Sequence, residues 1–280
     1  MAKRRFYNSK DAVSEKINPS DIKPTNSMKG DLILSKFEMS QVDIIVAFHG
    51  QYKKVTRLIE SIYRSTRPPF LLTLVDDGSK NKEFIEDIRN NTNINCIRLE
   101  KQVGLGAALE EGYKKTNFPW IVFMDSDCYV DNVNWLKFLG ESMLELKEKG
   151  IKMVSARYPN SNSDISFLSS PPKPVVNKED VILKSDEYLP LTCVLCHREL
   201  FPRIGGFIKP YPYGWYEDQE LAKRMQKNNF KQAICSKSWI NHDGMSTIKD
   251  LWKNNPEIKE AMSKNEEKCI SDINSLKNNK

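Results

Sequence analysis

Apolar residues occur along this chain in short runs that alternate with segments of helical periodicity. The run Val42–Phe48 contains one polar residue and is typical of a strand buried on both faces. After Gly50, apolar residues recur at i, i+3, i+4, i+7 and i+8, and this spacing predicts one face of an amphipathic helix: Val55, Leu58, Ile59, Ile62 and Tyr63. The chain therefore begins its ordered part with a strand followed by a helix.

The same alternation continues to about residue 156. It predicts strands at 70–75, 96–99 and 120–125, and helices at 84–88, 105–113 and 133–144, the last with Val133 on its apolar face. Strands separated by helices form β-α-β units, whose strands pair in parallel. We therefore expect an α/β fold built on a mostly parallel, twisted sheet.

The pattern loosens after residue 156. Residues 158–190 are rich in Ser, Asn and Pro and predict a long surface excursion, which in a compact domain is usually functional. A strand is predicted at 191–196, a helix after Glu217-Asp218, and a charged helix near the C-terminus. The expected divisions of the chain are an extension at 1–40, one domain at 41–245 made of halves 41–156 and 157–245, and a C-terminal segment at 246–280.

Composition is that of an ordinary globular protein, with 39% hydrophobic and 29% charged residues. No apolar run approaches the roughly 20 residues that span a bilayer, and the N-terminus lacks the apolar segment of a signal peptide. We therefore expect a cytoplasmic protein. Residues 1–30 hold seven basic and three acidic side chains. We interpret this tail as a solvated extension, with contact to nucleic acid or an anionic membrane as the alternative.

Six cysteines are scattered along the chain, and we expect them to be reduced. Cys193-Val-Leu-Cys196-His197 matches a haem-attachment pattern, but it lies in the apolar run of a predicted strand. No second cysteine pair stands at zinc spacing. Buried free thiols are therefore the favoured interpretation.

Two carboxylates, Asp125 and Asp127, stand at the end of the strand predicted at 120–125. Open α/β sheets bind their ligands outside the carboxyl ends of the strands. Carboxylate oxygens suit Mg²⁺ or Mn²⁺, and these ions suit a diphosphate. The alternative is that both residues only begin a turn before the next helix. Asp76-Asp77-Gly78-Ser79 leaves a similar choice open after the preceding strand.

Several short motifs occur in one order along residues 41–243: Ile44–His49, Leu74–Ser79, Val122–Asp127, Gly205-Gly206-Phe207, Glu217–Leu221 and Asn241-His242. Together they resemble the GT-A glycosyltransferases, specifically the inverting family 2 of nucleotide-sugar transferases. The resemblance implies a Rossmann-like, three-layer α/β/α fold with a mostly parallel mixed central sheet. It also implies an enzyme that moves a sugar from a nucleoside diphosphate sugar, with UDP favoured, to an acceptor hydroxyl, with a glycan favoured as acceptor.

By this resemblance, Asp127 is a direct ligand of a divalent ion, and Asp125 contacts the ribose or reaches the ion through water. His242 lies where many GT-A enzymes place a metal-binding histidine. Because imidazole binds Mn²⁺ more readily than Mg²⁺, manganese is favoured and magnesium is the alternative. A surface histidine without a role is the competing interpretation, and Asp243 is a weaker candidate for the same position.

The resemblance places the nucleotide near the ends of the first two strands. Asp77 would accept a hydrogen bond from the N3–H of a uracil-like base, and Phe48 or His49 would pack against the ring. Gly104 and Gly106 would let the chain approach the nucleotide closely, although a Gly-x-Gly pair is a weak signal. The complete predicted nucleotide-sugar site consists of Ala47, Phe48, His49, Asp77, Gly104, Asp125 and Ser126.

Asp218 is the predicted general base, which takes the acceptor proton during an in-line attack that inverts the anomeric carbon. Glu217 would orient it or contact the sugar. The alternative is that both are first-turn residues favoured by the helix dipole. Aromatic rings cover the apolar faces of sugars, and four of them favour the catalytic interpretation: Tyr211, Tyr213, Trp215 and Tyr216.

The chain departs from the family pattern in two places. Its first strand ends in Val46-Ala47-Phe48-His49 instead of Pro-Thr-Tyr-Asn, and Ala108-Leu109-Glu110 stands in place of Ala-Arg-Asn. The second change removes a cation expected near the diphosphate. A protein or a DNA base remains open as acceptor. A retaining enzyme, which Gly214-Trp215-x-Glu217-Asp218 suggests, and a non-catalytic nucleotide- or carbohydrate-binding module are further alternatives.

Overall fold

A computed structural model describes residues 37–66, 69–92, 94–159, 179–209, 211–212, 215–244 and 256–278. Its first half contains η3 (Met39–Gln41), β1 (Val42–Phe48), α1 (Tyr52–Ser65), β2 (Leu71–Asp76), α2 (Glu83–Asn91), β3 (Asn95–Arg98), α3 (Leu105–Lys115), β4 (Trp120–Met124), β5 (Cys128–Tyr129) and α4 (Trp135–Glu145). Its second half contains η4 (Lys147–Lys149), β6 (Ile151–Arg157), β7 (Val181–Ile182), β8 (Cys193–His197), α5 (Leu200–Arg203), α6 (Glu217–Lys227), β9 (Lys231–Trp239), β10 (Asn241–His242) and α8 (Pro256–Asn278).

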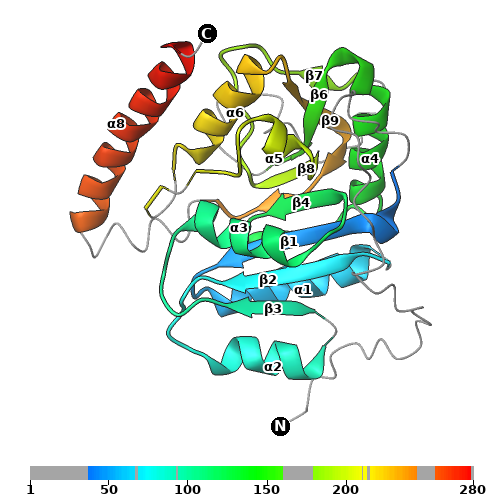
Figure 1. The fold of residues 1–280 in the computed structure, drawn as a ribbon. Coiled ribbons are helices and arrows are strands. Elements are labelled where there is room, and N and C mark those ends of the chain that lie inside the picture. The colour runs from blue at the N-terminus through cyan, green and yellow to red at the C-terminus, as the bar shows by residue number, and fades with distance from the viewer. Residues whose placement is uncertain are drawn as a thin grey trace.

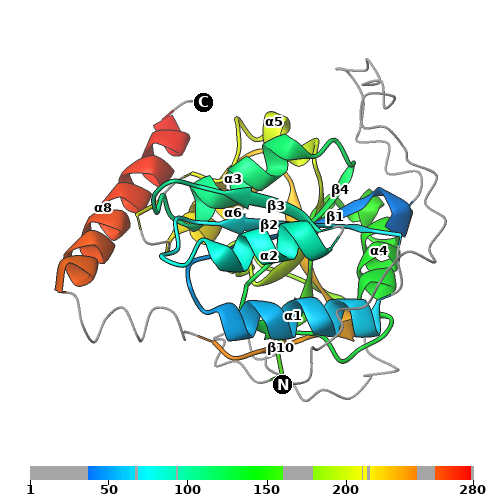
Figure 2. The same cartoon turned by 90° about the horizontal axis from the view of Figure 1, so that it is seen from below.

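The central sheet has eight strands in the order β3-β2-β1-β4-β8-β6-β9-β7. The β3-β2-β1-β4 half is parallel throughout, as is the β6/β9 pair, whereas β8 runs antiparallel to both β4 and β6. Helices α1 and α4 cover one face of this sheet and α3 and α5 the other (Figures 1 and 2). The predicted α/β class, with its mostly parallel mixed sheet in three layers, is confirmed.

The core follows the predicted periodicity. Every residue of β1 is buried, because helices cover both faces of the strand. The apolar face of α1 is buried as expected, at Val55, Leu58, Ile59 and Ile62. The six cysteines, all within the described residues, form no disulfide, and Cys193 and Cys196 are buried in β8. The interpretation as buried free thiols is confirmed.

One predicted helix position is wrong. Val133 precedes α4 and is 66% exposed, so it belongs to no buried helix face. A turn made by Asn132 begins the helix instead: its side-chain oxygen accepts the N–H of Asn134, and its carbonyl accepts the N–H of Trp135. Trp135 is the first core residue of α4, and its ring N–H donates to Thr66 Oγ1 at 2.6 Å.

The ends of the chain are described only in part. Phe37, within the expected extension, packs its ring edge-on against Trp120 with centroids 5.4 Å apart, so the core reaches residue 37. Residues 1–36, with the basic tail, and 160–178, with most of the expected excursion, lie outside the described residues. The helix expected near the C-terminus is α8, and it packs against α6. Among the described helices, none has both the length and the apolar composition that crossing a membrane requires.

Candidate active site

The candidate site lies at one edge of the sheet. Strands β2, β1 and β4 are parallel neighbours, so their carboxyl ends meet at the same edge. His49 follows β1, Asp77 follows β2 and Asp125 follows β4. The order of the strands therefore gathers residues that are far apart in the sequence.

A small second sheet adds His242 to this edge. Strand β10 pairs antiparallel with β5, which places His242 opposite Cys128. The backbone N–H of Asp243 also donates to the carbonyl oxygen of Asp127 at 3.2 Å. As a result, His242 Nε2 lies 3.0 Å from Asp127 Oδ1 and 3.5 Å from Asp125 Oδ2. The three residues predicted as metal ligands thus lie in contact.

The three side chains interact electrostatically. Burial raises the pKa of Asp125, the charge of His242 opposes the rise, and the charge of Asp127 adds to it. Burial opposes the charged form of His242, but its hydrogen bond to Asp127 and the charge of Asp125 together raise its pKa. The carboxylates therefore favour a positive charge between them. Two carboxylates and one imidazole fit Mn²⁺ or Mg²⁺.

Cys128 joins this group, a neighbour that the sequence prediction missed. Its sulfur lies within 4.8 Å of potential ligand atoms of Asp127 and His242. The thiol donates to the carbonyl oxygen of Thr192 at 3.6 Å, and burial raises its pKa well above the ordinary value. A protonated thiol is a poor ligand for a hard cation, so Cys128 fits the wall of the site better than the ligand set. Its place beside Asp127 in the sequence was the available signal.

Asp77 organises the glycine-containing loop before α3. Its Oδ1 accepts the N–H of Val103 at 2.7 Å and its Oδ2 accepts the N–H of Gly104 at 3.0 Å. Gly104 has a φ of 93°, a conformation that disfavours other residues. Gly106 approaches protein, not open space: a Cβ there would lie 2.9 Å from the carbonyl oxygen of Lys209. The space beside Gly106 is thus taken up by Lys209, and close approach of Gly106 to the nucleotide stays a prediction.

The end of β1 presents one ring to this edge. Ala47 and Phe48 are buried, and the Phe48 ring packs edge-on against Phe84 at 5.8 Å between centroids. His49 is half-buried, and its Nδ1 lies 2.7 Å from the carbonyl oxygen of Asp77. Of the two rings predicted to pack against the base, His49 is the better placed.

Helix α6 begins with the predicted catalytic pair. Glu217 is 3% exposed, and its Oε2 accepts no hydrogen bond from the described residues. Asp218 is half-buried, and burial raises its pKa to about 7, opposed by its backbone N–H and assisted by the charge of Asp125. Burial and the charge of Asp218 raise the pKa of Glu217. The charge of Asp125 therefore acts on both carboxylates at the start of α6.

The four aromatic residues before α6 have different surroundings. Tyr211 is buried, and its hydroxyl donates to Asp272 of α8 at 3.0 Å, so its predicted role in covering a sugar is wrong. Trp215 and Tyr216 are half-buried, with φ values of 77° and 72°. Tyr213 lies outside the described residues. Sugar stacking by Trp215 and Tyr216 stays a prediction.

Asp243, the weaker metal candidate, is engaged elsewhere. Its Oδ2 pairs with Arg57 at 2.6 Å and with Lys54 at 3.5 Å, both from α1. The Arg57 guanidinium also stacks over the ring of Tyr129, 4.2 Å from its centroid. Leu109, at the position of the missing family cation, is buried, and the next residue, Glu110, pairs with Lys114 on the surface at 3.3 Å. Arg57 and Lys54 are thus cations beside the His242 end of the site.

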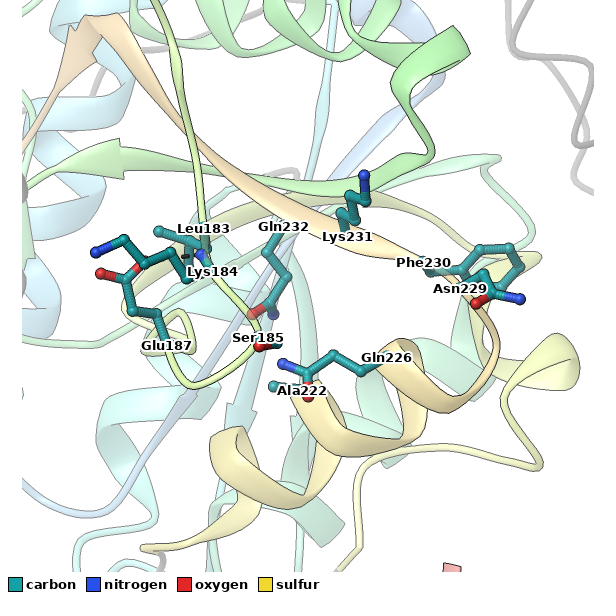
Figure 3. A pocket seen from close by; sticks show the side chains of 10 residues that line it. All are labelled: Leu183, Lys184, Ser185, Glu187, Ala222, Gln226, Asn229, Phe230, Lys231 and Gln232. Atoms are coloured by element: carbon teal, nitrogen blue, oxygen red, sulfur yellow. Dashed lines mark hydrogen bonds between the residues drawn. The ribbon is translucent and has the colours of Figure 1, made fainter. Parts of the chain in front are cut away.

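A cavity of about 230 Å³ lies elsewhere in the second half of the chain. It is lined by α6 from Ala222 to Gln226, by the start of β9 and by the segment after β7 (Figure 3). None of the predicted site residues lines it. We therefore assign it no role in the site.

Comparison with known proteins agrees with this arrangement. The family model described as glycosyl transferase family 2 matches residues 43–205. A glycosyltransferase of Haemophilus influenzae, described only as such, is 23% identical over 170 residues, which is 59% of this chain and 55% of that protein. The UDP-Gal:alpha-D-GlcNAc-diphosphoundecaprenol beta-1,3-galactosyltransferase of Escherichia coli is 25% identical over 198 residues, 64% of this chain and 66% of that protein. The chain thus spans less than two thirds of the length of either relative.

A solved structure supports the same fold. The crystal structure of GalNAc-T7 with UDP, GalNAc and Mn²⁺ superposes with a TM-score of 0.58 at 17% identity, covering 72% of this chain and 43% of that one. At this identity the likeness concerns the fold alone. The family model, however, matches more than half of the chain, including β1, β2, β4 and the residues that follow them. The chain therefore belongs to glycosyl transferase family 2, with the GT-A fold of those glycosyltransferases.

Proposed function

We propose that this protein transfers a sugar from a nucleoside diphosphate sugar to an acceptor hydroxyl with the help of a divalent cation. One observation carries the proposal: His242 Nε2 lies 3.0 Å from Asp127 and 3.5 Å from Asp125, although β10 and β4 are far apart in the sequence. A surface histidine without a role would have no reason to sit between two carboxylates. Asp125, Asp127 and His242 would hold the ion, with Mn²⁺ favoured.

The cation would supply charge neutralisation to the diphosphate leaving group, as a Lewis acid. The protein residues do the rest. Asp77 holds Val103 and Gly104 in place, so the loop before α3 is fixed at the strand edge where the nucleotide would bind. His49 would pack against the base. Arg57 and Lys54 lie beside Asp243 and could offset part of the missing family cation.

Asp218 is proposed as the general base. A base works best when its pKa lies near the working pH, and burial raises the pKa of Asp218 to about 7. The enclosed Oε2 of Glu217 lacks a hydrogen-bond partner among the described residues, and we propose that Glu217 orients Asp218 or contacts the sugar. In this arrangement the acceptor oxygen loses its proton to Asp218 as it attacks, and the anomeric carbon inverts.

The favoured donor is a UDP-sugar and the favoured acceptor is a glycan. The E. coli relative is named for a UDP-Gal donor and a lipid-linked sugar acceptor, and the GalNAc-T7 structure was solved with UDP and Mn²⁺. Both names support a UDP-sugar here. The identity of the sugar is a matter for direct measurement, as is the anomeric outcome, which NMR of the product reports.

The experiment is a thermal-shift panel of UDP-, GDP-, CDP- and dTDP-sugars with and without Mn²⁺, because ligands of the native state raise its apparent stability. We expect one UDP-sugar to raise Tm only with Mn²⁺ present. Asp127→Ala should abolish that shift, and Asp186→Ala, an exposed carboxylate outside the site, should leave it unchanged. A shift that is independent of Mn²⁺, or that survives in Asp127→Ala, would contradict the proposal.

A further inference from the structure

The two residues before α6 have an unusual backbone. Trp215 and Tyr216 both adopt positive φ values, 77° and 72°, although neither is glycine. Side chains with a Cβ disfavour this conformation, and it persists only where surrounding contacts determine it. The strained pair leads directly into Glu217 and Asp218. Whatever holds Trp215 and Tyr216 in place therefore also aims the first turn of α6.

Helix α8 supplies contacts to this segment from one face. Asn265 Nδ2 donates to the carbonyl oxygen of Pro212 at 2.8 Å, and the thiol of Cys269 donates to the carbonyl oxygen of Tyr216 at 3.8 Å. The side chain of Asp272 accepts the hydroxyl of Tyr211 at 3.0 Å. Positions 265, 269 and 272 are spaced by four and three residues, so they share one side of the helix. Asn265 and Cys269 are each 2% exposed.

A lysine connects this contact to the body of α6. Lys209 Nζ lies 3.2 Å from Asp272 of α8 and 3.5 Å from Glu220 of α6. Glu220 is fully buried and also pairs with Arg224, whose guanidinium donates to the carbonyl oxygens of Gly206 and Phe207. Helix α8, the first turn of α6 and the loop that precedes α6 are therefore joined by one polar network.

We propose that α8 is a brace for the residues that lead into α6. Asn265, Cys269 and Asp272 are positioning residues that hold Trp215 and Tyr216 in their strained conformation. They thereby orient the side chain of Asp218. The inference rests on the proposed function for the role of Asp218. The family model ends at residue 205, so the brace belongs to a part of the chain beyond that match. The brace predicts that turnover depends on α8, whereas binding of the donor and the metal does not.

The first test measures Mn²⁺-dependent hydrolysis of UDP-galactose and UDP-N-acetylglucosamine by the full chain. In Asn265→Ala we expect kcat to fall about tenfold, the effect of losing one buried hydrogen bond that orients the base. KM for the donor and the half-saturating Mn²⁺ concentration should stay within about twofold of wild type. Lys264→Ala is the matched control, since its side chain is exposed on the same helix and pairs with Glu260. An unchanged kcat in Asn265→Ala, or an equal loss in the control, would overturn the brace.

Cys269 provides a rescue test. Cys269→Ala removes the donor to the carbonyl oxygen of Tyr216, and Cys269→Ser keeps a hydroxyl donor on the same Cβ. We expect kcat to fall in the first variant and to recover in the second, with the same Tm for both. Both variants lose the packing of the sulfur atom, and only Cys269→Ala loses the hydrogen-bond donor. Equal kcat in the two variants would therefore refute the positioning role of Cys269.

Hydrogen exchange separates this inference from the proposed function. Amides of residues 215–221 should exchange faster in Asn265→Ala than in wild type and at the wild-type rate in Lys264→Ala. If wild-type protein hydrolyses neither donor and no nucleotide sugar of the thermal-shift panel raises Tm with Mn²⁺, the proposed function fails while the exchange result still decides the brace. Unchanged exchange over 215–221 in Asn265→Ala would overturn it.

Discussion

The carboxyl group of Asp43 is buried in the middle of β1, where it is 0% exposed. The hydroxyl of Thr73 on β2 lies 2.9 and 3.0 Å from its two oxygens. Burial raises the pKa of Asp43 to about 7, against the hydrogen bonds from Thr73 and Thr116 and the charge of Arg198. The folded protein therefore holds this proton over a range of pH in which the unfolded chain has released it.

The consequence for stability follows from proton linkage. Unfolded Asp43 titrates near 3.8 and folded Asp43 near 7, so between these values the folded state binds more protons and the free energy of unfolding falls as pH rises. At about 1.4 kcal/mol per pKa unit, the full loss is about 4 kcal/mol, of which about 3 kcal/mol falls between pH 5 and 8. Asp43→Asn cannot ionise, so its stability relative to wild type should rise by about 3 kcal/mol over that interval.

The assay is urea unfolding followed by tryptophan fluorescence at several pH values, with the m-value checked for constancy. Comparing the change with pH, and not the stability at one pH, cancels the direct effect of the amide on packing. Asp186→Asn, at an exposed position, is the control and should track wild type throughout. Parallel curves of unfolding free energy against pH for wild type and Asp43→Asn would refute the reasoning.

Three further outcomes are expected. Asp218 acts in its deprotonated form, and burial raises its pKa to about 7, so kcat/KM should rise with pH on the acid side. The midpoint of this rise should lie well above 3.8, even when a cation offsets the charge of Asp125. A profile that is flat from about pH 5 to 8 would contradict this expectation. His242→Ala should raise the half-saturating Mn²⁺ concentration by at least about tenfold, measured by metal titration of donor hydrolysis. Even loss of a residue that only hydrogen-bonds to a metal ligand typically lowers metal affinity by about tenfold or more. Trp135→Phe removes the hydrogen bond to Thr66 and should lower the free energy of unfolding by about 1 kcal/mol. In the Trp135→Phe background, Thr66→Val should cause no further loss, which urea unfolding of the double variant measures.

The helices and strands, and the strand that each carboxylate follows, could be predicted from the amino-acid sequence. Hydrophobic periodicity is a local property, so the buried run of β1 and the apolar face of α1 could be identified from the spacing of apolar residues alone. Asp125 and Asp127 follow β4 for the same reason. The error at Val133 was a boundary error, because a turn at Asn132 decides where α4 begins.

Which of these residues come into contact depends on how the elements pack against one another. Pairing of β10 with β5 brings His242 to Asp127, encloses Cys128 beside them, and leaves Asp243 to Arg57. Likewise, packing against α8 turned Tyr211 away from any ligand while Trp215, four residues later, stayed half-buried. Contacts of this kind depend on which surfaces are buried together once the whole chain has folded, and the pattern of neighbouring residues along the chain carries no information about that choice.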